Sequence, residues 1–142
     1  MQVIDLPLDR AGEALVAAWC RDRRLEVLAE RWHCRWGELD LVTQEDSALR
    51  FIEVKTRRQT GWDQSGLLAI GPAKQRCLSR AAACYLASLG NQAAVACRFD
   101  VALVRYRSEP SAAAVKVAAW GQGYLELWCY LPDAFSAVES GW

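Results

Sequence analysis

The chain has 142 residues, with 17 Lys and Arg against 17 Asp and Glu, and its formal net charge at pH 7 is zero. This length predicts one domain over residues 1–142, with a core at about 9–135 and frayed ends. Zero net charge excludes a strong global attraction to nucleic acid or to a membrane surface. No run approaches the ~18 apolar residues of a membrane span and no signal peptide is apparent, so we expect a cytoplasmic protein.

Six cysteines are scattered along the chain without a CxxC pair or a Cys/His cluster. This spacing argues against a zinc site and against a disulfide framework. We expect reduced cysteines, as in a reducing compartment. The single histidine, His33, falls in a predicted strand and is interpreted as a structural or surface residue rather than a general base.

Residues 9–24 predict the first helix, because Asp9 can cap it and apolar residues recur at helical spacing. Glu13 lies in the first turns, where the helix dipole favours a carboxylate. Residues 25–34 follow as a candidate strand.

Residues 36–58 predict two adjacent strands joined by a short polar turn. Polar and apolar residues alternate in 37–42 and again in 51–55, which is the period of a strand. The acidic and hydroxyl residues of 45–47 are typical of a turn, and so short a connection favours an antiparallel hairpin.

Acidic residues gather on one face of this hairpin. Glu53 and Lys55 are two residues apart and share a face, and strand pairing brings Asp40 or Glu38 to it. Carboxylates about 4–5 Å apart repel, so the cluster favours a cation or a shared proton. Carboxylates without neighbouring His or Cys favour Mg²⁺ or Mn²⁺, and Lys55 could orient a water that attacks phosphorus. The alternative is a solvated sheet face with weak surface ion pairs.

Basic residues follow the hairpin and open the next helix. Arg57 and Arg58 could hold phosphates bidentately, or they could serve only solubility at a strand end. Residues 59–71 predict a loop, in which Trp62 either stacks on a base or covers the core. Lys74 lies in the first turn of a helix predicted from Pro72 to about residue 89, where free amides attract phosphate.

Two further strands are predicted over residues 95–106 and 114–120. The tail after Gly121 is aromatic and apolar, and we expect it to pack on the domain. Together these elements predict an α/β protein with a mixed, largely antiparallel central sheet flanked by two helices.

Three strings of the sequence resemble the YraN family (UPF0102), a group of uncharacterised bacterial proteins: GELDLV at 37–42, FIEVKTR at 51–57 and RFDV at 98–101. The order Asp40, then Glu53-Val54-Lys55, is similar to the motif of the PD-(D/E)XK nuclease superfamily, which includes archaeal Holliday-junction resolvases. The resemblance covers roughly residues 9–135. It implies a restriction-endonuclease-like core.

The same resemblance implies roles for individual residues. Asp40, Glu53 and the main-chain carbonyl of Val54 would ligate Mg²⁺ or Mn²⁺. Glu13, in a Gly-Glu pair that matches the family, would contribute directly or through water, and Lys55 would orient the hydrolytic water. The remaining assignments are phosphate contacts and support around the metal ligands: Arg57, Arg58 and Lys74 for phosphate, and Glu38, Arg98 and Asp100 for support.

The predicted function is a Mg²⁺- or Mn²⁺-dependent DNA endonuclease, acting on branched or repair-intermediate DNA and leaving a 5′-phosphate and a 3′-hydroxyl. The alternative is a non-catalytic nucleic-acid-binding or adaptor module of the same fold, which the neutral net charge favours. Analogy with the resolvases predicts a homodimer.

Overall fold

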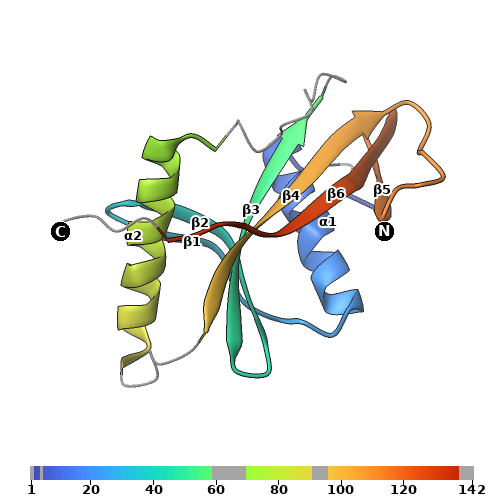
Figure 1. Cartoon of the computed structure of the whole chain (residues 1–142). Helices are drawn as coiled ribbons and strands as arrows, with labels where there is room; N and C mark the ends of the chain where they lie inside the picture. The colour runs from blue at the N-terminus through green and yellow to red at the C-terminus, as the bar shows by residue number, and fades with distance from the viewer. Residues whose placement is uncertain (1, 4, 59–69, 91–95, 138–142) are drawn as a thin grey trace.

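The computed structural model describes residues 2–3, 5–58, 70–90 and 96–137, and these form a six-stranded sheet with two helices (Figure 1). The elements in chain order are α1 (Leu8–Asp22), β1 (Glu26–Cys34), β2 (Gly37–Glu45), β3 (Ala48–Arg57), α2 (Pro72–Ser88), β4 (Cys97–Arg107), β5 (Lys116–Trp120) and β6 (Gly123–Phe135). Trp62 and most of the predicted loop around it lie outside the described residues.

The sheet has the strand order β1-β2-β3-β4-β6-β5. β3 and β4 run parallel, and every other neighbouring pair in that order runs antiparallel. The parallel pair is joined through α2, as a parallel connection requires a crossover. The predicted mixed, largely antiparallel sheet is therefore confirmed, and the architecture is compatible with a restriction-endonuclease-like core.

The two helices cover opposite faces of the sheet (Figure 1). Leu41 and Ile52 pack with α1, whereas their chain neighbours Val42 and Phe51 pack with α2. This division follows from the period of two along a strand, which sends successive side chains to opposite faces. The predicted hairpin is confirmed, because β2 and β3 pair antiparallel down to Glu45 opposite Ala48.

The start of α1 differs from the prediction. The helix begins at Leu8 after Pro7, and Asp9 lies in its first turn instead of capping it. The Pro7 carbonyl already accepts the first helical hydrogen bond, from the Ala11 amide at 2.8 Å, so the chain enters the helix before Asp9. The second helix begins at Pro72, as predicted.

The C-terminal tail packs on the domain as expected, but the sequence did not reveal that it forms a 13-residue strand between β4 and β5. Leu125, Glu126 and Leu127 are consecutive and all fully buried. A strand covered on both faces lacks the alternation that marks a half-exposed one. The predicted fraying of the last residues falls outside the described part of the chain.

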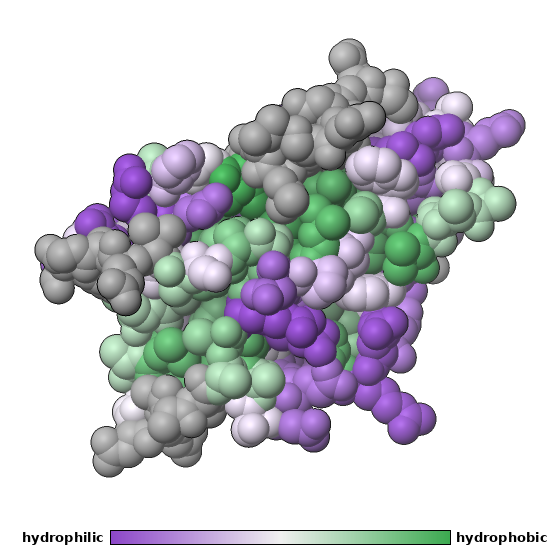
Figure 2. All heavy atoms as spheres, viewed as in Figure 1, coloured by the Kyte–Doolittle hydropathy of each residue, from purple (hydrophilic) through white to green (hydrophobic). Residues whose placement is uncertain are grey.

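All six cysteines are free thiols. Neither described helix is long and apolar enough to cross a membrane. On the face shown in Figure 2, hydrophilic residues form separate groups with hydrophobic residues between them.

Candidate metal centre

The site lies where strands β2 and β3 part. Their main-chain pairing runs as far as Leu41 opposite Ile52, and the next residue on each strand is an acid, Asp40 on β2 and Glu53 on β3. Beyond that point the Val54 amide donates to Asp40 Oδ2 at 2.9 Å. The Asp40 side chain thus satisfies an amide at the end of the β2–β3 ladder, which fixes its carboxylate beside Glu53.

The carboxyl groups of Asp40, which is partly buried, and Glu53, which is buried, lie close enough to interact electrostatically. Glu53 is only 7 % exposed, so the interpretation of a solvated sheet face is wrong for this residue. Burial, and then the charge of Asp40, raise the pKa of Glu53 to about 8. Burial also raises the pKa of Asp40, although the Val54 amide opposes that shift. At neutral pH Glu53 is therefore largely protonated.

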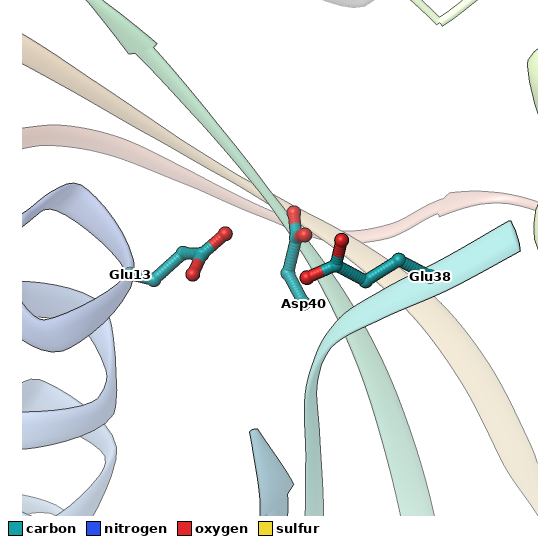
Figure 3. Close-up of side chains that lie close together, drawn as sticks. All are labelled: Glu13, Glu38 and Asp40. Carbon is teal, nitrogen blue, oxygen red and sulfur yellow. The ribbon is translucent and has the colours of Figure 1, made fainter. Parts of the chain in front are cut away.

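Glu13 reaches the same place from helix α1, which approaches β3 closely at Gly12. A Cβ at Gly12 would lie 2.0 Å from Thr56 Oγ1, so only glycine allows this approach. Oxygens of Glu13, Glu38 and Asp40 lie within 4.8 Å of one another, with Asp40 between the other two (Figure 3). Burial, and then Asp40, raise the pKa of Glu13 to about 7.

Three basic side chains border these acids. Lys55 Nζ and Lys74 Nζ each lie 3.7 Å from Glu53 Oε1. Arg31 Nη1 lies 3.2 Å from Glu13 Oε2, and Arg31 Nε lies 3.7 Å from Glu38 Oε1. The lysines therefore approach one end of the cluster and the arginine approaches the other.

Arg31 was not predicted as a site residue, because the charged residues around it in the sequence are typical of a solvated face. The register of β1 and β2 places it: Glu30 lies opposite Leu41 and Trp32 opposite Leu39, so Arg31 faces Asp40. This register becomes visible only in the structure, where it shifts at a bulge between Val27 and Ala29.

An open cavity of about 370 Å³ joins these groups. All of the predicted catalytic and metal-ligating residues line it, together with Glu38, a predicted phosphate contact and three further residues. The lining consists of Asp9, Glu13, Arg31, Glu38, Asp40, Glu53, Val54, Lys55, Thr56 and Arg57.

The residues that line this cavity, apart from Asp9, fall within a segment shared with known proteins. A family model described as uncharacterised protein family UPF0102 matches residues 12–104. The chain belongs to the UPF0102 family. Its resemblance to that family, inferred from the sequence strings, is thereby confirmed.

Cyanobacterial UPF0102 proteins are similar to this chain over most of its length. One from Synechococcus sp. (strain JA-3-3Ab) is 47 % identical over 121 residues, covering 85 % of this chain and 92 % of the relative. One from Synechocystis sp. (strain ATCC 27184 / PCC 6803 / Kazusa) is 37 % identical over 145 residues, covering 90 % and 97 %. The four acids that α1, β2 and β3 contribute to the site all lie inside the segment matched by the UPF0102 model: Glu13, Glu38, Asp40 and Glu53.

Other predicted site residues of this UPF0102 chain lie away from the cavity. The Arg58 guanidinium is 5.7 Å from the ring centroid of Tyr106 and 5.4 Å from that of Trp120. Asp100 braces Arg98, as expected, through a 2.9 Å ion pair. Neither residue of that pair lines the cavity, and their support of the metal ligands stays a prediction.

His33 lies at the surface near the acidic cluster. Its side chain is 64 % exposed, and its Nδ1 is 3.9 Å from Glu38 Oε2. The interpretation of His33 as a structural or surface residue therefore holds.

Proposed function

We propose that this UPF0102 protein is a Mg²⁺- or Mn²⁺-dependent endonuclease that hydrolyses phosphodiester bonds in DNA, including branched and repair-intermediate DNA. One observation carries the proposal: the partly buried Asp40 and the buried Glu53 lie together at the fork of two strands, with Lys55 Nζ 3.7 Å from Glu53 Oε1. A buried acid pair is costly to maintain without a cation, so it suggests a binding function rather than a structural one.

The donor set fits a hard divalent cation. Asp40, Glu53 and the main-chain carbonyl of Val54 would hold it, and Glu13 would contribute directly or through water. Oxygen donors suit Mg²⁺ and Mn²⁺ better than zinc, which prefers imidazole and thiolate ligands. The cavity lining among the described residues contains neither a histidine nor a cysteine.

The cation and Lys55 would have different roles in hydrolysis. A bound cation supplies positive charge against the phosphate oxygens and makes a water more acidic. The Lys55 ammonium, 3.7 Å from Glu53 Oε1, would orient the attacking water. Attack on phosphorus with departure of the 3′-oxygen would leave a 5′-phosphate and a 3′-hydroxyl.

DNA would be held by phosphate contacts rather than by reading of bases. Arg57 lines the cavity, and Lys74 on α2 reaches Glu53 from the side opposite α1. Such contacts position a backbone without specifying sequence. Because the chain has zero net charge, affinity would depend on these local cations and would fall as salt increases.

The test combines calorimetric titration with Mg²⁺ and Mn²⁺ and cleavage of labelled branched and linear DNA. Asp40→Asn and Glu53→Gln preserve shape and remove charge, and Asp46→Asn, at the exposed β2–β3 turn, is the matched control. We expect the two site variants to lose metal binding and to cleave at least ~100-fold more slowly, with the control unchanged.

Two results would contradict the nuclease proposal. The first is a wild-type protein that binds neither cation. The second is DNA affinity that survives in Asp40→Asn without any cleavage by the wild type, which would favour the non-catalytic module of the same fold. DNA affinity that does not respond to salt would argue against a nucleic-acid partner altogether.

A further inference from the structure

Arg31 occupies a position at this site that the nuclease chemistry does not use. Its guanidinium bridges two carboxylates from different elements, Glu13 on α1 and Glu38 on β2, at 3.2 and 3.7 Å. Glu38 Oε1 is buried and accepts no hydrogen bond. Arg31 is thus the basic group nearest to this half of the cluster, while the lysines lie at Glu53.

The contacts of Arg31 are suited to displacement. A charge-assisted hydrogen bond of arginine to carboxylate is usually about 2.7–2.9 Å long, and both contacts here are longer. The side chain is 38 % exposed, so the guanidinium already borders solvent where it pairs with the carboxylates. The guanidinium of Arg31 therefore offsets the charge of Glu13 and Glu38 without holding their side chains in short hydrogen bonds.

The backbone directs this side chain to the cavity. Arg31 has a φ of 52°, in the left-handed region that a residue with a side chain rarely adopts. It lies in β1 between two residues that pair normally with β2. Such a conformation persists only where its surroundings determine it, and here the ion pairs with Glu13 and Glu38 contribute.

We propose that Arg31 is the resident counter-ion of the acidic site, and that a divalent cation binding at Glu13 and Asp40 displaces its guanidinium. The inference rests on the proposed metal-dependent function and adds that Arg31 regulates cation binding at the site. Glu13 cannot present the same oxygen to Arg31 and to a cation at full strength, so the two compete. Arg31 thereby raises the cation concentration at which the site fills.

The test is a calorimetric Mn²⁺ titration of the wild type and three variants. Arg31→Asn removes the charge with a residue that tolerates the left-handed backbone, and Arg31→Lys retains the charge. Arg21→Gln is the matched control, because Arg21 forms an ion pair of the same 3.2 Å length with Glu30 at the surface. We expect Arg31→Asn to bind Mn²⁺ about threefold to tenfold more tightly, Arg31→Lys to stay near the wild type, and Arg21→Gln to match it.

A second readout uses the wild-type protein and so does not depend on how Arg31→Asn folds. In protein with ¹⁵N-labelled arginine, the Arg31 Nε–H resonance, assigned with Arg31→Lys, should shift on saturation with Mg²⁺, while that of Arg21 should not. Wild-type or weaker Mn²⁺ affinity in Arg31→Asn, or an unchanged Arg31 resonance at saturation, would overturn the inference and leave the nuclease proposal standing. If Mn²⁺ bound to none of the four proteins, the wild type included, both the inference about Arg31 and the nuclease proposal would be overturned.

Discussion

Two acidic sites in this protein, each built around a buried carboxyl group, differ in how their carboxyl groups are satisfied. Asp100 is fully buried, and it accepts hydrogen bonds from Arg98 Nε at 2.9 Å, from the Asp133 amide at 2.8 Å and from the Tyr130 hydroxyl. At the fork of β2 and β3, by contrast, Asp40 and Glu53 face each other, and the lysines reach only 3.7 Å. Hydrogen-bond donors surround Asp100, whereas Asp40 lies beside other carboxyl groups, those of Glu13, Glu38 and Glu53.

This difference distinguishes a carboxylate that stabilises the fold from carboxyl groups that can bind a ligand. A buried carboxylate with a full set of donors stabilises the fold and has little left to offer a ligand. At the fork, burial and mutual repulsion raise the pKa values of Glu13 and Glu53 to about 7 and about 8. These carboxyl groups are therefore partly protonated at neutral pH and have oxygens available for a ligand. Unfavourable electrostatics of this kind are characteristic of functional sites.

The sharpest test of the comparison is stability without metal. We expect Asp100→Asn to lower the free energy of unfolding by about 3 kcal/mol, because the side-chain amide nitrogen that replaces one oxygen faces other donors and Arg98 loses its negatively charged partner. Asp40→Asn should change it by less than about 1 kcal/mol, since its carbonyl still accepts from Val54 and the repulsion with Glu53 is relieved. Urea unfolding at pH 8, followed by circular dichroism, measures both. Equal losses would mean that the two acidic sites do not differ.

The second prediction concerns pH. The pKa values of Glu13 and Glu53 are raised above the ordinary glutamate value of about 4.3, so the folded state holds more protons than the unfolded state at intermediate pH. Stability of the metal-free protein should therefore fall by several kcal/mol as pH rises from about 5 to 8, since each pKa unit corresponds to about 1.4 kcal/mol. Glu53→Gln should remove most of this slope, and Glu109→Gln, at an exposed position, should retain it. If the free energy of unfolding of Glu53→Gln fell equally steeply with pH, the raised pKa of Glu53 would not be the cause of the slope.

The sequence predicted the part of the fold that carries the site. Alternation and a polar turn defined residues 37–57 closely, because this hairpin has faces of different polarity. The strand β6 was missed because Leu125 to Leu127 are buried on both faces, Glu126 included. That buried glutamate accepts from Arg105 Nε at 2.6 Å and from the Ser111 amide at 2.8 Å, partners that become visible only once the sheet order is known.

The candidate site was predictable to the extent that it follows strand register. Two-residue spacing and hairpin pairing brought Asp40 and Glu53 together, and family resemblance added Glu13. Arg31 depends on a left-handed residue and on the β1–β2 register, neither of which a composition or periodicity pattern contains. The supporting pair at Asp100 was placed correctly as a brace of Arg98, but its distance from the cavity follows from the three-dimensional arrangement.

A third prediction tests how the helix positions Glu13. Gly12→Ala should lower the free energy of unfolding by about 1–2 kcal/mol, although alanine favours helices, because the new methyl group would overlap Thr56 Oγ1. It should also weaken Mn²⁺ binding, since relief of the clash moves Glu13 away from Asp40. Gly71→Ala is the control, because a Cβ there meets nothing within 4 Å. Thermal unfolding and calorimetry check the two effects, and a Gly12→Ala protein as stable as wild type would show that the close approach is not required.

The smallest expected effect is a transfer of protons on cation binding, and it measures the suppressed charge of the fork directly. Because the pKa values of Glu13 and Glu53 are about 7 and about 8, both carboxyl groups are partly protonated at neutral pH and must lose protons to act as ligands. Titration with Mn²⁺ at pH 7, in two buffers of different ionisation enthalpy, should show release of about one proton per ion, and the apparent affinity should rise between pH 6 and 8. At pH 9 the release should approach zero, because both groups are already ionised, and Glu53→Gln should release less at pH 7. Binding at pH 7 without proton release would mean that the cation binds only carboxylates that were already ionised. The carboxyl groups at the fork would then not be protonated in the metal-free protein, and the proposed difference from Asp100 would be wrong.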